Sequence, residues 1–549
     1  MNTISGETNI IRGFSISPGL AEGQIYLHRD IFDAKDSFSQ TETYNADAEV
    51  DRLDRATLKI TEDLLTLAAR VEKEIDIQLA GVFGAHSAIV NDALLKEELR
   101  REIIENLVSA GSAVKSVFLR WEKRFLQMES IIAREKGEDF RDISIRLRNA
   151  LANVTGHALE NIPPGCILAT QRLLPTDTLF LASRSTSGVL LEYGTMGSHA
   201  ALFTRQMNVP CITGISNILN ILPADGYALV DAQDSILTVN PDLQARTFFS
   251  ARIKQYANDL KLAKKNSQLP SFTEDGIEVA VNANIGGKED ANIALEHGAQ
   301  GIGLYRLEQF YIGRSVPPNK MELLEEMNET LSAFKGKPVC IRLLDIGSDK
   351  PLPFMGFLTE PNPALGRRGV RLMRQFPELL YTQLEAILCL VKDYTVQILI
   401  PMVTIPDDVL FVRKALTKLA SQHDITPPQL GAMIETPAAA LSASRIAPHV
   451  EFMSFGTNDL TQYAFAADRE NIEVEDYYDD TSAVIFRLIE LVHHDIPKMP
   501  LSICGELAGR QEAIAHLLKL GIRSLSVAAP LVPSVKETIR NTNLASKMV

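Results

Sequence analysis

The chain has 549 residues, of which 46% are hydrophobic and 23% are charged, and its formal net charge is -14. This length exceeds one ordinary domain and predicts two to four of them, at roughly 100 to 200 residues each. The composition excludes a mainly disordered chain, and the negative charge argues against nucleic acid as the main partner, because phosphate backbones are bound by an excess of Lys and Arg.

Sequence signals for export or membrane insertion are missing. The N-terminal segment has no basic region followed by an apolar one, and no stretch of about 18 apolar residues occurs downstream. The cysteines lie far apart, with neither a C-x-x-C pair nor the spacing of metal ligands. They are Cys166, Cys211, Cys340, Cys389 and Cys504. We therefore expect a protein of the reducing cytoplasm that does not enter a membrane.

The first half of the chain changes its periodicity twice. Residues 11–28 are short, Gly-rich and β-branched, which is typical of strands joined by tight turns. From about residue 45 to 147, apolar residues recur every three or four positions, which predicts a bundle of amphipathic helices. Short apolar runs then return. We predict an α/β domain made of residues 1–34 and 147–249, into which a helical domain of residues 35–146 is inserted.

The second half reads as a linker followed by a barrel. Residues 250–268 are charged and weakly apolar, as in a helical linker. In residues 269–549, apolar strand-like runs alternate with helical stretches, and this pattern and size predict a (β/α)8 TIM barrel. Seven strands are clear, and we expect the eighth near Arg368 to Leu372. The predicted fold class is thus α/β multidomain.

Chemically capable side chains follow the predicted barrel strands. Because barrels build active sites at the carboxyl ends of their strands, we expect these side chains to meet in one mouth. Arginines bind phosphate in a fork, and two carboxylates suit Mg2+ that completes its shell with substrate oxygens and water. One arginine alone is more often part of a solvated ion pair, but the joint placement favours a functional site. The residues are Arg306, Arg342, Asp345, Glu435, Asn458, Asp459 and Cys504.

His199 ends the Gly-rich segment GTMGSH and begins an apolar helical stretch. A helix N-terminus offers free N–H groups and a positive dipole end to a phosphoryl group. A partly neutral imidazole can also act as a nucleophile at pH 7. A histidine after a glycine turn is commonly only a helix cap, however, so the spacing alone leaves both roles open.

Long segments of the sequence match a known family almost end to end. They include SPGLAEG, VFGAHSAIVNDALL, GTMGSHAALFTRQMNVPCITG, RLLDIGSDKPLPFM, NPALGRRGVRL, SFGTNDLTQYAFAADREN and CGELAG. In these segments the chain resembles enzyme I of the bacterial phosphoenolpyruvate-dependent sugar phosphotransferase system. The resemblance implies transfer of the phosphoryl group of phosphoenolpyruvate to a histidine and then to the phosphocarrier protein HPr, with release of pyruvate.

The resemblance also implies roles for individual residues. His199 would be the phosphorylated histidine, and Cys504 would donate a proton to C3 of enolpyruvate. Glu435 and Asp459 would bind Mg2+. The residues that would hold or orient phosphoenolpyruvate are Arg306, Arg342, Arg368, Asn458 and Arg469, with Lys350 at a further polar position of the mouth.

The same resemblance implies how the domains cooperate. The helical insert would dock HPr, and the α/β domain would be a swivelling phosphohistidine domain that travels between the barrel and HPr. Residues 250–268 would form the hinge. The family is commonly a homodimer through its barrel, so a homodimer is expected.

The sequence departs from the family pattern beside the expected chemistry. In GTMGSH, Thr195 replaces a glycine and Gly197 replaces a threonine, whose lost hydroxyl would cost roughly 1 kcal/mol in orienting the histidine ring. The pattern R-T-E-F reads RLEQ from Arg306 to Gln309, and C-G-E-L-A-G-D ends in Arg510 instead of aspartate. No predicted catalytic residue is lost, so we expect a working transferase whose rate or regulation is altered.

Two other interpretations fit less well. A pyruvate-phosphate dikinase or phosphoenolpyruvate synthase shares the phosphohistidine and the barrel but needs a nucleotide-binding domain. The chain has no G-x-x-x-x-G-K-[ST] loop, and the helical insert is too small for an ATP-grasp module. A degenerate relative that only binds a partner is disfavoured because the charged catalytic residues are retained.

Overall fold

The computed structural model describes two compact units of the chain, Met1–Tyr256 and Ala257–Val549. Each unit is treated by itself below. The residues described are 9–29, 45–74, 77–126, 131–152, 159, 162–174, 177, 181, 186–194, 199–207, 209–312, 314–347, 354, 360, 362–469 and 471–545.

The first unit contains a mixed β-sheet. Within the described residues it has eight strands in the order β1-β8-β7-β3-β4-β5-β6-β2. Strand β3 pairs in parallel with β4 and antiparallel with β7, so an opening strand shares its sheet with strands from beyond the helical block. The strands are β1 (Asn9–Arg12), β2 (Phe14–Ser17), β3 (Leu20–Leu27), β4 (Ile167–Thr170), β5 (Gly188–Leu191), β6 (Cys211–Thr213), β7 (Tyr227–Asp231) and β8 (Ile236–Val239).

The sheet of the first unit is covered on both faces. In β4, Ile167 and Ala169 belong to one buried cluster, and Leu168 belongs to another. Because successive side chains of a strand point to opposite faces, these two clusters lie on opposite sides of the sheet. Buried Ala201 and Phe203 of helix α7 (His199–Gln206) belong to the second cluster and hold that helix against the sheet.

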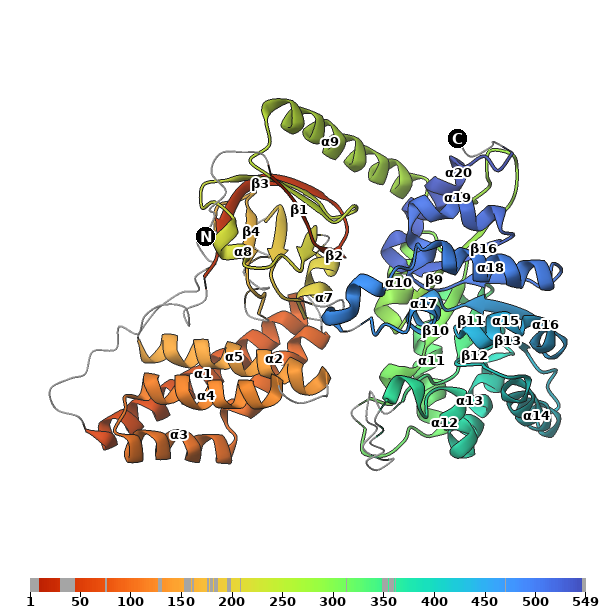
Figure 1. Ribbon diagram of the computed structural model, residues 1–549. Helices are drawn as coiled ribbons and strands as arrows, with labels where there is room; N and C mark the ends of the chain where they lie inside the picture. The colour runs from red at the N-terminus through yellow and green to blue at the C-terminus, as the bar shows by residue number, and fades with distance from the viewer. Residues whose placement is uncertain are drawn as a thin grey trace. The chain divides into compact units, whose positions relative to one another are not determined.

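The helical block lies between β3 and β4 in the chain and forms the predicted amphipathic bundle (Figure 1). Its helices pack around buried Leu64, Phe83, Ile103 and Phe118. The Asp92 side chain caps α3 by accepting a 2.9 Å hydrogen bond from the Leu95 amide. The helices are α1 (Ala46–Glu74), α2 (Ile77–Val90), α3 (Ala93–Asn106), α4 (Ala110–Leu126) and α5 (Ile131–Leu151).

The remaining helices of the first half are α8 (Ile218–Ile221) and α9 (Leu243–Lys265). Helix α9 runs through the boundary between the two units, in the segment where the sequence predicts a helical linker. Its buried Phe249 packs against Leu20 and Leu229 of the sheet.

The second unit is a closed barrel of parallel strands, as the sequence predicts. Neighbouring strands follow one another around the barrel from β9 to β16, and β16 pairs with β9 to close it. The strands are β9 (Ala280–Ile285), β10 (Ile302–Arg306), β11 (Pro338–Arg342), β12 (Thr395–Ile400), β13 (Gln429–Ile434), β14 (Phe452–Phe455), β15 (Leu501–Ile503) and β16 (Ser524–Ala528).

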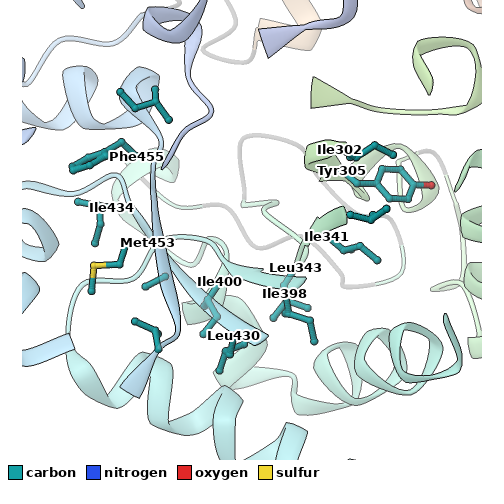
Figure 2. Close-up of a cluster of buried hydrophobic side chains, with 14 of the residues drawn as sticks. Ile302, Tyr305, Ile341, Leu343, Ile398, Ile400, Leu430, Ile434, Met453 and Phe455 are labelled. Carbon is teal, nitrogen blue, oxygen red and sulfur yellow. The ribbon is translucent and has the colours of Figure 1, made fainter. Parts of the chain in front are cut away.

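Helices surround the barrel and bury its outer face. Figure 2 shows Ile341 of β11, Ile398 of β12 and Leu430 of β13 in the large cluster that strands and helices share. The helices are α10 (Lys288–Glu296), α11 (Lys320–Leu331), α12 (Val370–Gln375), α13 (Pro377–Leu390), α14 (Pro406–Gln422), α15 (Pro437–Leu441), α16 (Ala443–Ile446), α17 (Thr457–Phe465), α18 (Ala483–Asp495), α19 (Gln511–Lys519) and α20 (Val532–Arg540).

The eighth strand is not where the sequence analysis expected it. Residues 368–372 contain no strand: Gly369 has a positive φ of 57° and precedes α12. The eighth strand is β16, in which Ser524 and Ser526 alternate with apolar residues. Their hydroxyls bond the side chains of Asn282 and Asn284 on β9, at 3.1 and 2.7 Å. A strand with polar residues on one face does not read as a buried apolar run.

All cysteines of the chain are free thiols. Within the described part of the chain, no helix combines the length and the apolar character needed to cross a membrane.

Helix α14 offers a matched test of the barrel core. Leu416 is 1% exposed and Leu410 is 42% exposed on the same helix. We expect Leu416→Ala to lower the free energy of unfolding by about 2 to 5 kcal/mol, because it removes buried methyl groups and leaves a cavity. Leu410→Ala should change it by less than about 0.5 kcal/mol. Urea titration followed by circular dichroism measures both, and equal losses would contradict this packing.

Candidate active site at the barrel mouth

Most of the side chains predicted to form a site stand at the carboxyl ends of the barrel strands. Arg306 and Arg342 end β10 and β11, Glu435 directly follows β13, and Cys504 directly follows β15. Since all barrel strands are parallel, these positions share one end of the barrel. Predicted residues in the connections at this same end are Arg368, Asn458, Asp459 and Arg469.

Glu308 fixes Arg342 in the mouth. This glutamate lies in the short turn after β10, and its Oε1 accepts hydrogen bonds from Arg342 Nη2 and from the Asp345 amide, both at 3.0 Å. Arg342 Nη1 also lies 3.0 Å from Asp345 Oδ2. Arg342 is therefore held by two carboxylates. The sequence around Glu308 gives no sign of this role, because Arg342 lies on the next strand of the barrel.

Arg368 bridges two buried carboxylates. Its Nε and Nη2 donate to the Asp345 oxygens at 2.9 Å, and its Nη1 and Nη2 donate to the Asp459 oxygens at 2.8 and 3.0 Å. Nη1 also donates to the Tyr463 hydroxyl at 3.2 Å. A guanidinium has five N–H donors, so all of them are in use. Burial opposes the charge of Arg368, but Asp345 and Asp459 outweigh it and raise its pKa.

Three carboxylates come together beside Arg368. Asp345, Glu435 and Asp459 each place an oxygen within 4.8 Å of the others. Burial alone would raise the pKa of Asp345, but the arginines around it lower this pKa to about 2, with Arg368 and Arg342 the strongest and Arg469 adding to them. Asp345 is therefore ionised, and Arg469 is close enough to influence it.

For Glu435, the same two arginines, Arg368 and Arg342, do not offset the effect of burial. Glu435 is 1% exposed, and burial together with the nearby Asp345 and Asp459 raises its pKa to about 8. Its Oε1 accepts a hydrogen bond from the Met402 amide. The approach of the following strand depends on Gly456, because a Cβ there would lie 2.7 Å from Glu435 Oε2. Burial and the two neighbouring carboxylates thus disfavour a negative charge on Glu435.

Cys504 points into the barrel interior. It shares a small inner cluster with Cys340, Leu399 and Met433. The Ser454 hydroxyl donates to its Sγ at 3.4 Å, and the thiol donates to a backbone carbonyl at 3.5 Å. Burial raises the pKa of this thiol to about 11, so it keeps its proton at neutral pH.

Arg306 differs from Arg342 and Arg368. Among the residues that the structure describes, it forms no ion pair with a carboxylate. Partial desolvation and the nearby Arg342 guanidinium lower its pKa. Two cations in proximity, one of them without a carboxylate partner, favour the binding of an anion between them.

Asn458 connects two loops of the mouth. Its side-chain Oδ1 accepts a 2.8 Å hydrogen bond from the Glu506 amide, which follows β15. Its backbone carbonyl accepts a 3.2 Å hydrogen bond from the Tyr478 hydroxyl, in the connection between α17 and α18. Both groups of Asn458 are therefore engaged in holding neighbouring loops.

Two predicted site residues cannot be related to this geometry. Lys350 lies outside the described residues. His199 is the first residue of α7, where the sequence predicts a helix start, but its side chain is outside what the structure describes.

Comparison with known proteins matches three parts of the chain to one group of proteins. The family profile described as "PEP-utilising enzyme, PEP-binding domain" matches residues 261–544. Two further profiles, "PEP-utilising enzyme, N-terminal" and "PEP-utilising enzyme, mobile domain", match residues 12–136 and 162–235.

Curated relatives cover nearly the full length. A phosphoenolpyruvate-protein phosphotransferase of Staphylococcus carnosus is 32% identical over 97% of this chain and 94% of its own. That of Buchnera aphidicola subsp. Schizaphis graminum is 30% identical over 98% of this chain and 95% of its own. The NMR solution structure of an Enzyme I (nEIt) protein covers 45% of this chain at 23% identity, with a TM-score of 0.37.

The bridge made by Arg368 can be tested by its removal. We expect Arg368→Met to lower the free energy of unfolding by about 3 to 5 kcal/mol at pH 7, because Asp459 stays buried without the cation that binds it and Asp345 keeps only its contact with Arg342. The control is Arg413→Met, which breaks the exposed pair in which Arg413 Nη2 contacts both Glu451 oxygens, and it should cost less than about 1 kcal/mol. Urea titration compares them, and similar losses would contradict the bridge's importance.

Proposed function

Because the chain belongs to the family of phosphoenolpyruvate-protein phosphotransferases, we propose that it takes the phosphoryl group of phosphoenolpyruvate onto His199 and passes it to HPr. Pyruvate is released, and the reaction is the first step of a sugar phosphotransferase system. The observation that carries this proposal is the barrel mouth, where fixed arginines, a carboxylate cluster and a protonated thiol stand at one end of the strands.

The arginines bind the anionic substrate. Arg306 is the strongest candidate for direct contact, because it makes no ion pair with a carboxylate within the described residues. Arg342 adds charge from a position fixed by Glu308. Arg368 contacts the phosphate only if it gives up a present partner, of which the Tyr463 hydroxyl is the least costly because it is uncharged. Asn458, Arg469 and Lys350 orient the substrate.

The carboxylate cluster fits Mg2+. Asp345, Glu435 and Asp459 offer hard oxygen ligands. Asp345 Oδ1 and both Asp459 oxygens each accept one bond from Arg368 and keep a further lone pair. Burial, together with the nearby Asp345 and Asp459, raises the pKa of Glu435, and a bound cation would stabilise its ionised form. Bound Mg2+ would supply positive charge to the phosphoryl oxygens. Glu435 and Asp459 are the proposed ligands, and Asp345 is a third carboxylate beside them.

The phosphoryl transfer needs a neutral imidazole nitrogen of His199. This nitrogen attacks phosphorus, the bond from phosphorus to the bridging oxygen breaks, and the electron pair stays on that oxygen as an enolate. The arginines stabilise the charge that spreads over the phosphoryl and enolate oxygens. The histidine becomes a phosphohistidine and can donate to HPr.

Cys504 completes the reaction. Its thiol gives a proton to C3 of the enolate, a C2 carbonyl forms, and pyruvate leaves while the thiolate recovers a proton from water. A pKa of about 11 supports this role, because the proton is present at neutral pH. Conversion of the enol to the ketone drives the phosphorylation of a nitrogen.

The other parts of the chain serve transfer to the partner. Helices α1 to α5 are the proposed docking site for HPr, and exposed Leu58, Leu65, Leu94 and Ile104 offer apolar surface there. On the barrel, exposed Leu365 and Leu441 offer apolar surface, and we propose that the chain forms a homodimer through this domain. The free cysteines suit the cytoplasm.

The central test follows the phosphoryl group. Purified protein incubated with Mg2+ and 32P-labelled phosphoenolpyruvate should gain an acid-labile label and pass it to added HPr. His199→Ala should abolish the label, because the accepting nitrogen is gone. Cys504→Ser should slow pyruvate formation by about 100-fold or more, since a serine hydroxyl is a poorer acid.

The control variant is His494→Ala, which changes an exposed histidine on α18 and should keep the label. A label that survives in His199→Ala would show that another residue accepts the phosphoryl group. A wild-type protein that is never labelled would contradict the proposed function as a whole.

The metal site has a readout that does not depend on turnover. In a His199→Ala background with phosphoenolpyruvate present, Mg2+ should raise the melting temperature, because a ligand that binds only the folded state stabilises it. At a Mg2+ concentration of about 100 times Kd, the gain is about 2.7 kcal/mol. Adding Glu435→Gln should remove most of this shift. An unchanged shift would exclude Glu435 as a ligand.

A further inference from the structure

Arg510 forms a two-pronged ion pair with Asp480. Its Nε donates to Asp480 Oδ2 at 2.9 Å, and its Nη2 lies 2.9 Å from Asp480 Oδ1. Asp480 is 5% exposed, so the pair has one buried partner. Such forks fix geometry as well as charge, because both parallel contacts must be made together.

Each partner belongs to a different loop of the mouth. Arg510 directly follows the short turn η9 (Glu506–Gly509), which comes after Cys504. Asp480 lies in the connection from α17 to α18, the segment that also carries Arg469 and Tyr478. The ion pair therefore joins the loop of the proposed proton donor to the loop of a proposed substrate-orienting residue.

The near end of the Cys504 loop is already held tightly. A Cβ on Gly505 would lie 1.9 Å from Thr457 Oγ1, so only glycine allows this approach to α17. The Asn284 side chain donates to the Cys504 carbonyl at 3.0 Å, and the Glu506 amide donates to Asn458 at 2.8 Å. Arg510 supplies the corresponding attachment at the far end of the loop.

The Asp480 segment is likewise held at two points. The Tyr478 hydroxyl binds the Asn458 carbonyl at 3.2 Å, and Asp480 binds Arg510. Asn458 thus contacts both loops directly, and the ion pair between Asp480 and Arg510 connects the same two loops at a second point. Loss of Arg510 would leave Asp480 buried near the like charges of Glu506 and Asp479.

We infer that Asp480 and Arg510 form a positioning pair, which clamps the Cys504 loop to the Arg469 and Tyr478 segment and so sets the thiol against the substrate. This inference rests on the proposed function, in which Cys504 protonates C3. The pair acts through Cys504 and touches no reacting atom. It also explains the departure at position 510: with Asp480 opposite, the aspartate of the pattern C-G-E-L-A-G-D would face a second carboxylate.

The experiment is a double-mutant cycle on full-length protein. We expect Arg510→Met and Asp480→Asn each to lower kcat for pyruvate formation about tenfold, with KM for phosphoenolpyruvate within about threefold of wild type, since misplacement of a catalytic group by ~1 Å costs up to about 100-fold. The double variant should also be about tenfold slower, because both changes remove the same interaction.

Two further variants sharpen the test. Arg510→Lys keeps the charge but loses the fork, and it should fall between wild type and Arg510→Met. Arg510→Asp introduces the residue of the family pattern, and it should be the slowest single variant here because two carboxylates would face each other. Combining Arg510→Asp with Asp480→Asn should recover part of the rate.

A second readout separates positioning from a general structural effect. If the thiol is misplaced, phosphoryl transfer outpaces protonation, and free enolpyruvate should appear transiently in the ultraviolet spectrum of the Arg510→Met reaction. The control is Arg413→Met, which removes an ion pair between Arg413 Nη2 and Glu451 at the opposite end of the barrel and should match wild type in both readouts.

The outcomes are distinct. The positioning pair would be overturned if the double variant were about 100-fold slower than wild type, because the two single effects would then be independent. It would also be overturned if Arg510→Met and Asp480→Asn were as fast as the Arg413→Met control. A wild type that gains no label from phosphoenolpyruvate would overturn the proposed function instead. If Arg510→Met fails to fold, Arg510→Lys and Asp480→Asn with the same two readouts decide the question.

Discussion

The barrel mouth depends on the placement of Arg368 between Asp345 and Asp459. Two carboxylates buried this deeply need a cation, and the guanidinium satisfies both with all its donors. The bridge joins the end of β11 to the start of α17, so it fixes one side of the mouth before any ligand binds. It also uses up the binding capacity of Arg368. Arg306 is therefore the first candidate for binding the anion, because it forms no ion pair with a carboxylate among the described residues.

The same burial sets the protonation states that the chemistry requires. Cys504 and Glu435 are both buried, and desolvation is the largest cause of the raised pKa of each. For the thiol, this keeps a proton available for donation. For Glu435, it disfavours the ionised form, which a bound cation would stabilise. One physical effect thus supports an acid and a cation site within the same mouth.

Sequence patterns predicted the barrel well because its strands are apolar runs bounded by polar ends. The missed strand is β16, in which Ser524 and Ser526 bond asparagines of β9. These serines interrupt the apolar run by which the other strands are recognised in the sequence. Local patterns also gave no sign that Glu308 would hold Arg342, because the two meet only when neighbouring strands align. The role of His199 stays a prediction, since its side chain lies outside the described residues.

Arg510 illustrates the limit of transferring a family pattern position by position. Against the pattern alone, an arginine in place of an aspartate reads as a possible defect beside the thiol. In the fold, it meets Asp480 from another loop, and the charge reversal at position 510 becomes the complement of a buried carboxylate. The two adjacent aspartates at 479 and 480 cannot be told apart in sequence, yet only Asp480 is buried against the arginine. A residue that departs from a family pattern can thus be interpreted only together with the residue that it contacts in the fold. Here the contact with Asp480 makes Arg510 an additional attachment for the loop of Cys504.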